Sequence, residues 1–153
     1  MKRIPTIVVL LLAAMVFSAC RDSNQQAAEQ LLERANRLFE QQQYDRALIA
    51  IDSLRKVYPG AIDTRKKALH LQQDIELKRS QEELAVVDSV LQAVKHDYEY
   101  QRQKVEKDKQ ELRATPEELT MLTKTRVRRD SLQTRFDMLC AKIRYIHKKQ
   151  KEL

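Results

Sequence analysis

The stretch Thr115-Pro116-Glu117-Glu118 lies between two long segments that are rich in helix-forming residues. Threonine is favoured as the cap that precedes a helix, and proline is favoured at the first helical position. Glu118 follows Thr115 by three residues, which is the position that closes a capping box. These residues therefore predict that a new helix starts at residue 116 and that the chain turns back near residues 113–118.

The segment before this turn has a hydrophobic repeat of seven residues, which is typical of a coiled coil. The repeating positions are Leu77, Leu84, Leu91, Tyr98, Val105 and Leu112, with Val87 and Val94 three residues after two of them. The segment after the turn repeats in the same way at Leu132, Phe136, Leu139, Ile143, Ile146 and Leu153. We therefore expect an antiparallel coiled-coil hairpin over residues 77–153, about 50 Å long.

The two seams also predict which residues face each other. In an antiparallel pair the numbers of facing residues add up to a constant, and a sum of 230 pairs apolar positions with apolar positions. This sum places Leu84 against Ile146 and Tyr98 against Leu132, and its midpoint is residue 115 in the predicted turn. An open helix that dimerises with a second copy through the first seam is the alternative.

The composition favours helices along the whole chain. Gly60 is the single glycine among 153 residues, and there are three prolines. Because tight turns and phosphate-binding loops need glycine, a β-sandwich, a P-loop and a dinucleotide-binding fold are excluded. We expect an all-α fold, with a short repeat-like helical hairpin before the long coiled-coil hairpin. No Pro or Gly interrupts residues 61–113, although the capping-box sequence Ser-Gln-Glu-Glu at Ser80 leaves a helix break open.

Two shorter helices are predicted before Gly60, over residues 27–42 and 44–57. Their expected inward-facing residues are Leu31, Ala35, Leu38, Ala47, Ile51 and Leu54. Pro59 and Gly60 end the second helix, and Gly60 is expected to take the left-handed cap conformation. The residues expected to cover this hairpin from the next helix are Ile62, Ala68, Leu69 and Ile75.

The segment 28–61 resembles a single tetratricopeptide repeat. The residues that fit its frame are Leu31, Ala35, Leu38, Tyr44, Ala47, Ile51 and Pro59, and Tyr44-Asp45-Arg46-Ala47 is the most similar stretch. The pattern does not recur 34 residues later, so no repeat array is expected. The resemblance implies a groove for a partner protein in the region 27–76, with Leu31, Leu38, Tyr44 and Tyr58 around it. In the alternative interpretation this is a generic helical hairpin, and these side chains belong to its core.

The N-terminus has the pattern of an export signal. Lys2 and Arg3 precede an apolar run over residues 7–17, which is too short to span a bilayer, and Ser18-Ala19-Cys20 follows. The small residues before the cysteine resemble the lipobox of bacterial lipoproteins, with Phe17 where leucine is usual. The resemblance implies a signal peptide over residues 1–19, lipid attachment at Cys20 and a polar tether over residues 20–26. An ordinary secretory peptide with a chance cysteine is the alternative.

The lipoprotein interpretation implies an anchor in the membrane through acyl chains rather than through a helix. Arg21 replaces the aspartate that, in enteric lipoproteins, favours retention at the inner membrane. We therefore expect the protein in the outer membrane, facing the periplasm. The N-terminal region also resembles the tetratricopeptide lipoprotein of the machinery that assembles outer-membrane barrels, which implies a role in outer-membrane protein assembly.

The basic residues are concentrated in the last helix. Without the signal peptide, 27 basic and 22 acidic residues remain, and the end of the chain carries Arg144, Lys148, Lys149 and Lys151. This basic strip is either a solvated face or a surface for anionic lipid or an acidic partner. Export argues against nucleic acid as the partner.

No arrangement of residues typical of catalysis or metal binding is found in the sequence. His70, His96 and His147 are far apart and have no ligand at metal-binding spacing, and Cys140 has the surroundings of a small core residue. We expect no enzyme activity, no metal and no cofactor. The favoured function is a non-enzymatic interaction adaptor of the cell envelope. The alternatives are a coiled-coil spacer that forms homo-oligomers and a protein that binds an anionic surface.

Overall fold

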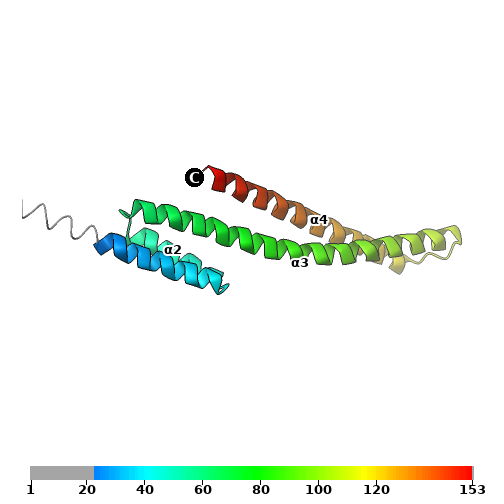
Figure 1. The fold of residues 1–153 in the computed structure, drawn as a ribbon. Coiled ribbons are helices and arrows are strands. Elements are labelled where there is room, and N and C mark those ends of the chain that lie inside the picture. The colour runs from blue at the N-terminus through cyan, green and yellow to red at the C-terminus, as the bar shows by residue number, and fades with distance from the viewer. Residues whose placement is uncertain (1–22, 153) are drawn as a thin grey trace, which may run out of the picture. The chain divides into compact units, whose positions relative to one another are not determined.

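A computed structural model describes residues 23–152 of the chain as helices joined by short turns (Figure 1). The first helix covers residues 23–40. The later helices are α2 (Tyr44–Val57), α3 (Ile62–Gln110) and α4 (Pro116–Lys151). The described range contains no strand, so the prediction of an all-α fold is confirmed. The predicted signal peptide over residues 1–19 and the lipid-attachment site Cys20 lie outside the described residues.

The chain divides into two compact units between Ile75 and Glu76. The first unit contains the helix 23–40, α2 and the first part of α3. The second unit contains the rest of α3 and the whole of α4, joined by the turn at residues 111–115.

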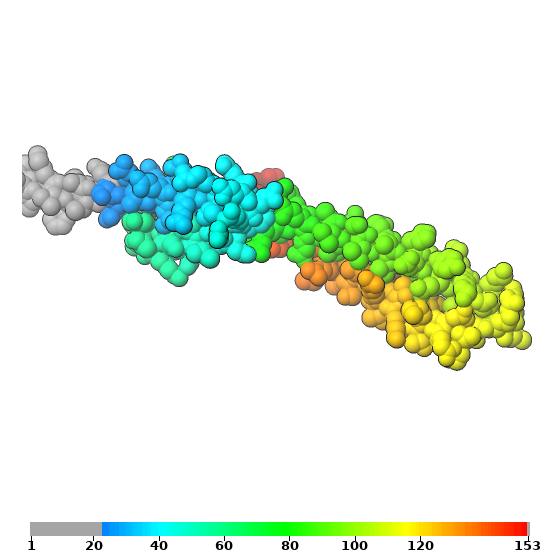
Figure 2. All heavy atoms as spheres, turned by 90° about the horizontal axis from the view of Figure 1, so that it is seen from below, coloured from blue at the N-terminus to red at the C-terminus, as the bar shows by residue number. Residues whose placement is uncertain are grey.

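The first unit is built around a core to which all three of its helices contribute. The buried residues of this core are Leu32, Ala35, Ala47, Ala50, Ile51, Leu54, Ala68, Leu71 and Ile75. The four alanines let the helix backbones approach closely, while the leucines and isoleucines fill the space between them. Figure 2 shows the helix 23–40 and α2 side by side, with their side chains packed along the line between them. The predicted inward positions Ala35, Ala47, Ile51 and Leu54 are confirmed.

The first helix begins earlier than predicted. Residues 23–26 were expected in a polar tether, but they form the first turn of the helix 23–40. The Gln25 amide nitrogen donates hydrogen bonds to Glu29 Oε1 at 3.0 Å and to Thr64 Oγ1 at 2.8 Å. Thr64 is buried on α3, so its hydroxyl needs a polar partner. A polar contact therefore holds this turn, and the hydrophobic pattern gives no sign of it.

The prediction that Ile62 covers the hairpin is wrong, because its side chain is 63% exposed. The buried face of α3 in this unit follows the spacing of three and four residues at Ala61, Thr64, Ala68, Leu71 and Ile75. Ile62 is one residue out of this phase, which turns its side chain about 100° away from the core. Thr64 and Leu71 occupy positions that the sequence prediction did not assign to the core.

Gly60 does not take the left-handed conformation that we expected for it. The residues with positive φ in the described range are Gln42 (φ 59°) and Leu112 (φ 56°), and each follows the end of a helix. After the helix 23–40, the Gln43 N–H donates to the Leu38 carbonyl and the Gln42 N–H donates to the Phe39 carbonyl, both at 2.9 Å. These two bonds form a Schellman motif, which usually has glycine at the left-handed position.

The second unit is a helical hairpin with its seam between α3 and α4. The buried apolar residues of the seam are Val87, Leu91, Val94, Val105, Leu139 and Ile146. The helix α3 runs without a break through Ser80, which is buried and donates its hydroxyl to the Glu76 carbonyl at 2.7 Å. The capping box at Ser80 is therefore not used.

The pairing of α3 with α4 differs from the predicted sum of 230. Arg135 binds Glu83 at 2.6 Å, and these residue numbers add up to 218. Lys142 binds Glu76 at 2.8 Å with the same sum. The predicted pairing would separate each pair by about 18 Å along the helix axis, which is beyond side-chain reach. Nearer the turn, the Thr125 hydroxyl donates to the Gln101 side-chain oxygen at 3.0 Å, which gives a sum of 226. The predicted register is therefore wrong, because hydrophobic spacing alone does not fix how far one helix slides along the other.

The position of the turn accounts for part of this difference in pairing. The predicted turn at 113–118 lies in fact at 111–115, so its midpoint is residue 113 rather than residue 115. Leu112, which we expected in the seam, has left-handed backbone and a side chain that is 95% exposed. The Arg113 N–H donates to the Asp108 carbonyl and the Leu112 N–H donates to the Lys109 carbonyl, which is a second Schellman motif.

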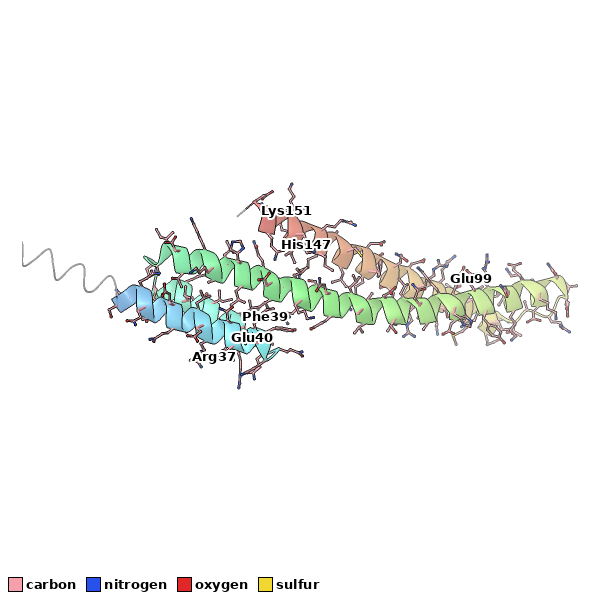
Figure 3. All side chains as sticks on the ribbon, in the orientation of Figure 1. Arg37, Phe39, Glu40, Glu99, His147 and Lys151 are labelled. Carbon is pink, nitrogen blue, oxygen red and sulfur yellow. The ribbon has the colours of Figure 1, made fainter. Side chains whose placement is uncertain are left out.

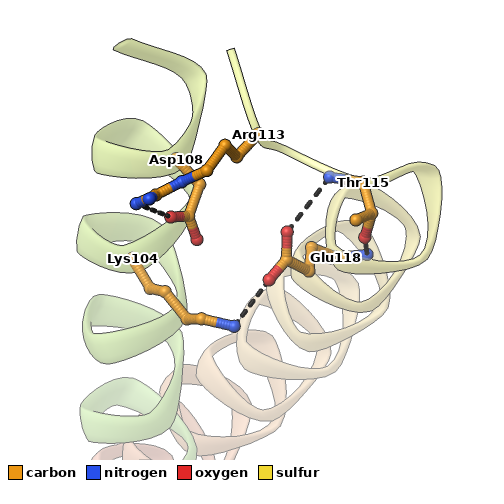
Figure 4. Close-up of polar contacts among 5 residues, drawn as sticks. All are labelled: Lys104, Asp108, Arg113, Thr115 and Glu118. Atoms are coloured by element: carbon orange, nitrogen blue, oxygen red, sulfur yellow. Dashed lines mark hydrogen bonds and ion pairs between the residues drawn. The ribbon is translucent and has the colours of Figure 1, made fainter. Parts of the chain in front are cut away.

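The start of α4 confirms the predicted capping box (Figure 4). The Thr115 hydroxyl accepts a hydrogen bond from the Glu118 N–H at 3.2 Å, and the Glu118 carboxylate accepts one from the Thr115 N–H at 3.1 Å. Lys104 on α3 donates to the same carboxylate at 2.5 Å, and Arg113 forms an ion pair with Asp108 at 3.7 Å. The hydrogen bond from Lys104 lowers the pKa of Glu118, and the Thr115 N–H lowers it further.

Candidate functional site

A shallow groove of about 410 Å³ lies in the first unit, between the helix 23–40 and α2. The residues that line it are Leu31, Arg34, Leu38, Arg46, Ile49, Ala50 and Ser53. Four of these side chains are apolar, two are arginines and one is a serine. The groove therefore combines an apolar floor with positive charge at its borders.

The helical phase explains why this groove forms beside the core. Leu31, Arg34 and Leu38 follow each other by three and four residues, so they share one stripe of the helix 23–40. The neighbouring stripe contains Leu32 and Ala35, which are buried in the core. Leu31 and Leu38 consequently touch the core on one side and line the groove on the other, and both are half-buried.

The floor of the groove includes a side chain that the core does not use. Ile49 on α2 is 66% exposed, while Ala47, Ala50 and Ile51 beside it are buried. Fully burying an isoleucine side chain contributes about 1.5–3 kcal/mol relative to leaving it in water. Ile49 is therefore available to a partner that covers the groove.

Within residues 23–152, the two arginines of the groove differ in their contacts. Arg34 forms no hydrogen bond or ion pair with any residue in the range 23–152, and Arg46 donates to the neutral amide oxygen of Gln43 at 3.0 Å. Arg37 on the same helix is different, because it forms an ion pair with Glu33 at 2.8 Å. Figure 3 shows Arg37 in the last turns of this helix, near Phe39 and Glu40. The groove thus presents guanidinium groups that are ready to bind a carboxylate.

The structure brings together two of the four residues that the sequence placed around a groove. Leu31 and Leu38 line it, but Tyr44 and Tyr58 do not. Tyr44 packs on the core beside Phe39, with ring centroids 6.0 Å apart. Tyr58 is the C-terminal cap of α2, and its N–H donates to the Leu54 carbonyl at 3.0 Å.

Sequence reasoning missed the other residues of the groove. Arg34 and Arg46 are ordinary surface arginines in the sequence, and only the approach of the two helices brings them to one groove. Ile49 did give a signal, since it is an apolar residue outside the phase of Ala47, Ile51 and Leu54. A single apolar residue on a polar helix face is common, so this signal alone does not locate the groove.

The basic strip at the end of α4 is partly occupied by internal contacts. Lys149 donates to Glu152 at 2.7 Å and lies over the Tyr145 ring, 5.8 Å from its centroid. The hydrogen bond to Glu152 raises the pKa of Lys149. Lys148 and Lys151 form no ion pair within the described range, nor does Arg144. Figure 3 shows His147 and Lys151 in the last turns of α4.

The described residues 23–152 contain no group of three His, Cys, Asp or Glu side chains that could hold a metal ion. His70, His96 and His147 are all exposed, and Cys140 is a half-buried free thiol. A search of the same range for a helix that is long and apolar enough to cross a membrane found none.

Comparisons with protein-family models, with curated proteins and with solved structures found no match to this chain. Function is therefore inferred from the chemistry of the chain's own surfaces. In the groove of the first unit, the exposed apolar side chain of Ile49 occurs together with Arg34, which has no partner among residues 23–152.

Proposed function

We propose that this protein is a non-enzymatic adaptor that binds a partner protein in the bacterial cell envelope, and that the groove of the first unit is the binding site. One observation carries the proposal: Leu31, Leu38 and Ile49 form an apolar floor next to Arg34, which has no partner among residues 23–152. Arginine is among the residues that contribute most to protein interfaces, and the apolar side chains around it exclude water when a partner binds.

The chemistry of the groove defines the kind of segment that it binds. Covering the floor requires leucine-like side chains, and Arg34 and Arg46 require a carboxylate that reaches the border of the groove. A short segment with apolar residues and at least one Asp or Glu meets both requirements. The volume of about 410 Å³ suits a few side chains rather than a whole domain.

The location of the adaptor is proposed from the first twenty residues. Basic residues, an apolar run and Ser18-Ala19-Cys20 support export, cleavage before Cys20 and lipid attachment there. Arg21 supports the outer membrane as the destination, with the helices facing the periplasm. The resemblance of residues 28–61 to one tetratricopeptide repeat supports a role in outer-membrane protein assembly as the process in which the adaptor acts.

Site-specific photo-crosslinking in living cells tests the proposal. A photoreactive residue replaces Ile49 in the groove, and in the control it replaces Ile62, which is 63% exposed in the same unit but does not line the groove. We expect the probe at position 49 to capture one envelope protein, identified by mass spectrometry, and the probe at position 62 to miss it. The additional substitution Arg34→Glu should abolish the crosslink.

The other outcomes of this experiment contradict the adaptor proposal. Equal crosslinks at positions 49 and 62 would show that the groove has no special role. Crosslinks from position 49 to a second copy of this chain alone would favour the spacer that forms homo-oligomers.

A second candidate function, binding to an anionic surface, is favoured by the basic strip. Arg144, Lys148 and Lys151 have no ion-pair partner within residues 23–152 and lie in the last turns of one helix. Each basic side chain close to an anionic surface contributes about 1 kcal/mol. Flotation of the chain with Cys20 replaced by serine, using vesicles with and without anionic lipid, tests this function. Equal flotation with both vesicles would exclude it.

A further inference from the structure

The hairpin of the second unit has an apolar surface outside its own seam. We call this surface the outer seam and define it by five residues: Val86, Val90, Val127, Ser131 and Met138. Three of these apolar side chains, those of Val86, Val127 and Met138, are largely exposed. The seam between α3 and α4 uses other positions, so the outer seam is not needed to close the hairpin.

The outer seam forms one continuous surface on both helices. Val90 from α3 and Val127 and Ser131 from α4 line the same open groove of about 560 Å³. Val86 precedes Val90 by four residues and therefore lies on the same face of α3. Met138 follows Ser131 by seven residues and continues the same face of α4. The helix faces that line the groove thus continue to Val86 on α3 and to Met138 on α4.

The spacing of the outer seam indicates a helical occupant. Val127, Ser131 and Met138 are separated by four and seven residues, and Val86 and Val90 by four. Side chains at these intervals form the holes into which the side chains of a third helix insert. An extended peptide has a period of two residues and would match neither wall of the groove.

The charge at the groove indicates that this occupant is acidic. The charged residues that line the groove are Lys124 and Arg128, and no carboxylate lines it. Neither Lys124 nor Arg128 forms a hydrogen bond or ion pair with any residue from 23 to 152. Glu83 of the same hairpin is already bound by Arg135, so it does not neutralise these two charges.

We propose that the outer seam binds an amphipathic helix of a partner protein, with apolar residues in the groove and Glu or Asp beside Lys124 and Arg128. A second copy of this chain fits the charge less well, because it carries a net charge of +7. The outer seam shares no residue with the groove of the first unit, so this inference stands or fails independently of the proposed adaptor site.

Binding of two designed helices to the full chain tests the proposal. The probes are fluorescent peptides of about 28 residues with leucine at the two core positions of each heptad, one with Glu and one with Lys at the flanking positions. We expect fluorescence anisotropy to show binding of the Glu peptide, at least about tenfold weaker binding of the Lys peptide, and weakening of the Glu complex by salt.

Two matched variants locate the binding site. Val127→Glu places a charge in the outer seam, whereas Val57→Glu makes the same change on α2 at a valine of similar exposure, 63% against 61%. We expect Val127→Glu to weaken the Glu peptide by at least about tenfold, because the new carboxylate repels the Glu side chains of the peptide and competes with them for Lys124 and Arg128. Val57→Glu should leave binding unchanged, and thermal unfolding monitored by circular dichroism should be the same for both variants.

Several results would overturn the proposal. Binding of neither peptide, equal binding of both, or unchanged binding by Val127→Glu would each contradict an acidic helix in the outer seam. Sedimentation velocity tests the remaining alternative, in which a second copy of this chain covers the outer seam. A dimer of the full chain that Val127→Glu dissociates would assign the outer seam to a second copy.

Discussion

The two units of this protein bury their apolar side chains in different ways. The first unit places a core between three helices, and Leu54, Ile75 and its central alanines are fully buried there. The second unit has two helices, and Leu139 and Ile146 are the only buried residues of α4 within the described range. Two helices cannot enclose a core, so much of each helix surface stays in water. The unit with fewer buried side chains is expected to open locally at lower free energy.

Polar contacts compensate only in part for the thin seam of the hairpin. Arg135 with Glu83 and Lys142 with Glu76 are exposed ion pairs, and each such pair contributes about 0–1 kcal/mol. The Arg129 guanidinium lies 4.1 Å from the centroid of the Tyr98 ring, which adds a cation–π contact between the helices. These contacts fix the pairing of the helices more than they stabilise it. Local opening is therefore expected to cost more free energy in the first unit than in the hairpin.

The largest expected effect comes from removing a buried side chain in the core of the first unit. Leu54→Ala removes a fully buried side chain and should lower the free energy of unfolding by about 2–5 kcal/mol. Leu139→Ala in the hairpin should cost less, because the surface can relax around it. Urea unfolding monitored by circular dichroism measures both, with Ile62→Ala as a control that should change little. A larger loss for Leu139→Ala would contradict the comparison.

The next effect concerns the hairpin alone. Thr115→Ala removes the hydroxyl that accepts a hydrogen bond from the Glu118 N–H and should cost about 0.5–2 kcal/mol. Hydrogen exchange should become faster in the first turns of α4, while the core helices of the first unit keep their protection. Faster exchange spread equally over both units would show that they unfold as one.

A smaller and stabilising effect is expected from a substitution at the turn of the hairpin, and it is compared with one at the glycine of the first unit. Leu112 has φ 56° and an almost fully exposed side chain, so Leu112→Gly should stabilise the hairpin by about 1 kcal/mol. Gly60 has no positive φ and nothing within 4 Å of a Cβ built there. Gly60→Ala should therefore be tolerated or stabilise slightly, which is unusual for the only glycine of a chain. Thermal melting of the two variants measures both effects, and destabilisation by Leu112→Gly would contradict the assignment of strain to this turn.

The smallest effect is a pH dependence at the turn. Hydrogen bonding to Lys104 lowers the pKa of Glu118 below its ordinary value of 4.5 in the folded hairpin. The stabilisation is therefore present above pH 4.5 and disappears as the pH falls through the lowered pKa of Glu118. NMR titration should show this lowered pKa and its partial return toward 4.5 in Lys104→Met. Because Lys104 is exposed and Glu118 is only half-buried, the effect should weaken with salt.

Local chemistry could be predicted from the sequence, but the relative placement of helices could not. The bounds of α2 and the capping box at Thr115 were predicted correctly, because proline, glycine and cap residues act within one turn of helix. The pairing of Glu83 with Arg135 was missed, because the hydrophobic spacing of two helices does not fix how far one slides along the other. Leu112 was assigned to the seam from its heptad position and Gly60 to a left-handed cap from residue preference, and neither assignment is correct, because the helix end places Leu112 in the left-handed conformation and Gly60 outside it.

The candidate site shows the same division. The tetratricopeptide resemblance placed Leu31 and Leu38 at a groove, and both line the one observed. Arg34, Arg46 and Ile49 were missed because a groove between two helices depends on how their side chains face each other. How these side chains face each other is set by the packing of the two helices around core residues such as Ala35, which the period of either helix does not reveal.

The most direct test of the adaptor function uses the envelope protein captured from position 49. Its affinity for the purified chain is measured by isothermal titration calorimetry for wild type, Arg34→Glu and Arg37→Glu. Arg37 is the matched control, because it lies on the same helix but already binds Glu33. We predict affinity at least about tenfold weaker for Arg34→Glu, since a charged hydrogen bond contributes about 1.5–3 kcal/mol, and little change for Arg37→Glu. Equal losses for the two variants, or no loss for Arg34→Glu, would contradict the assignment of the groove as the partner site.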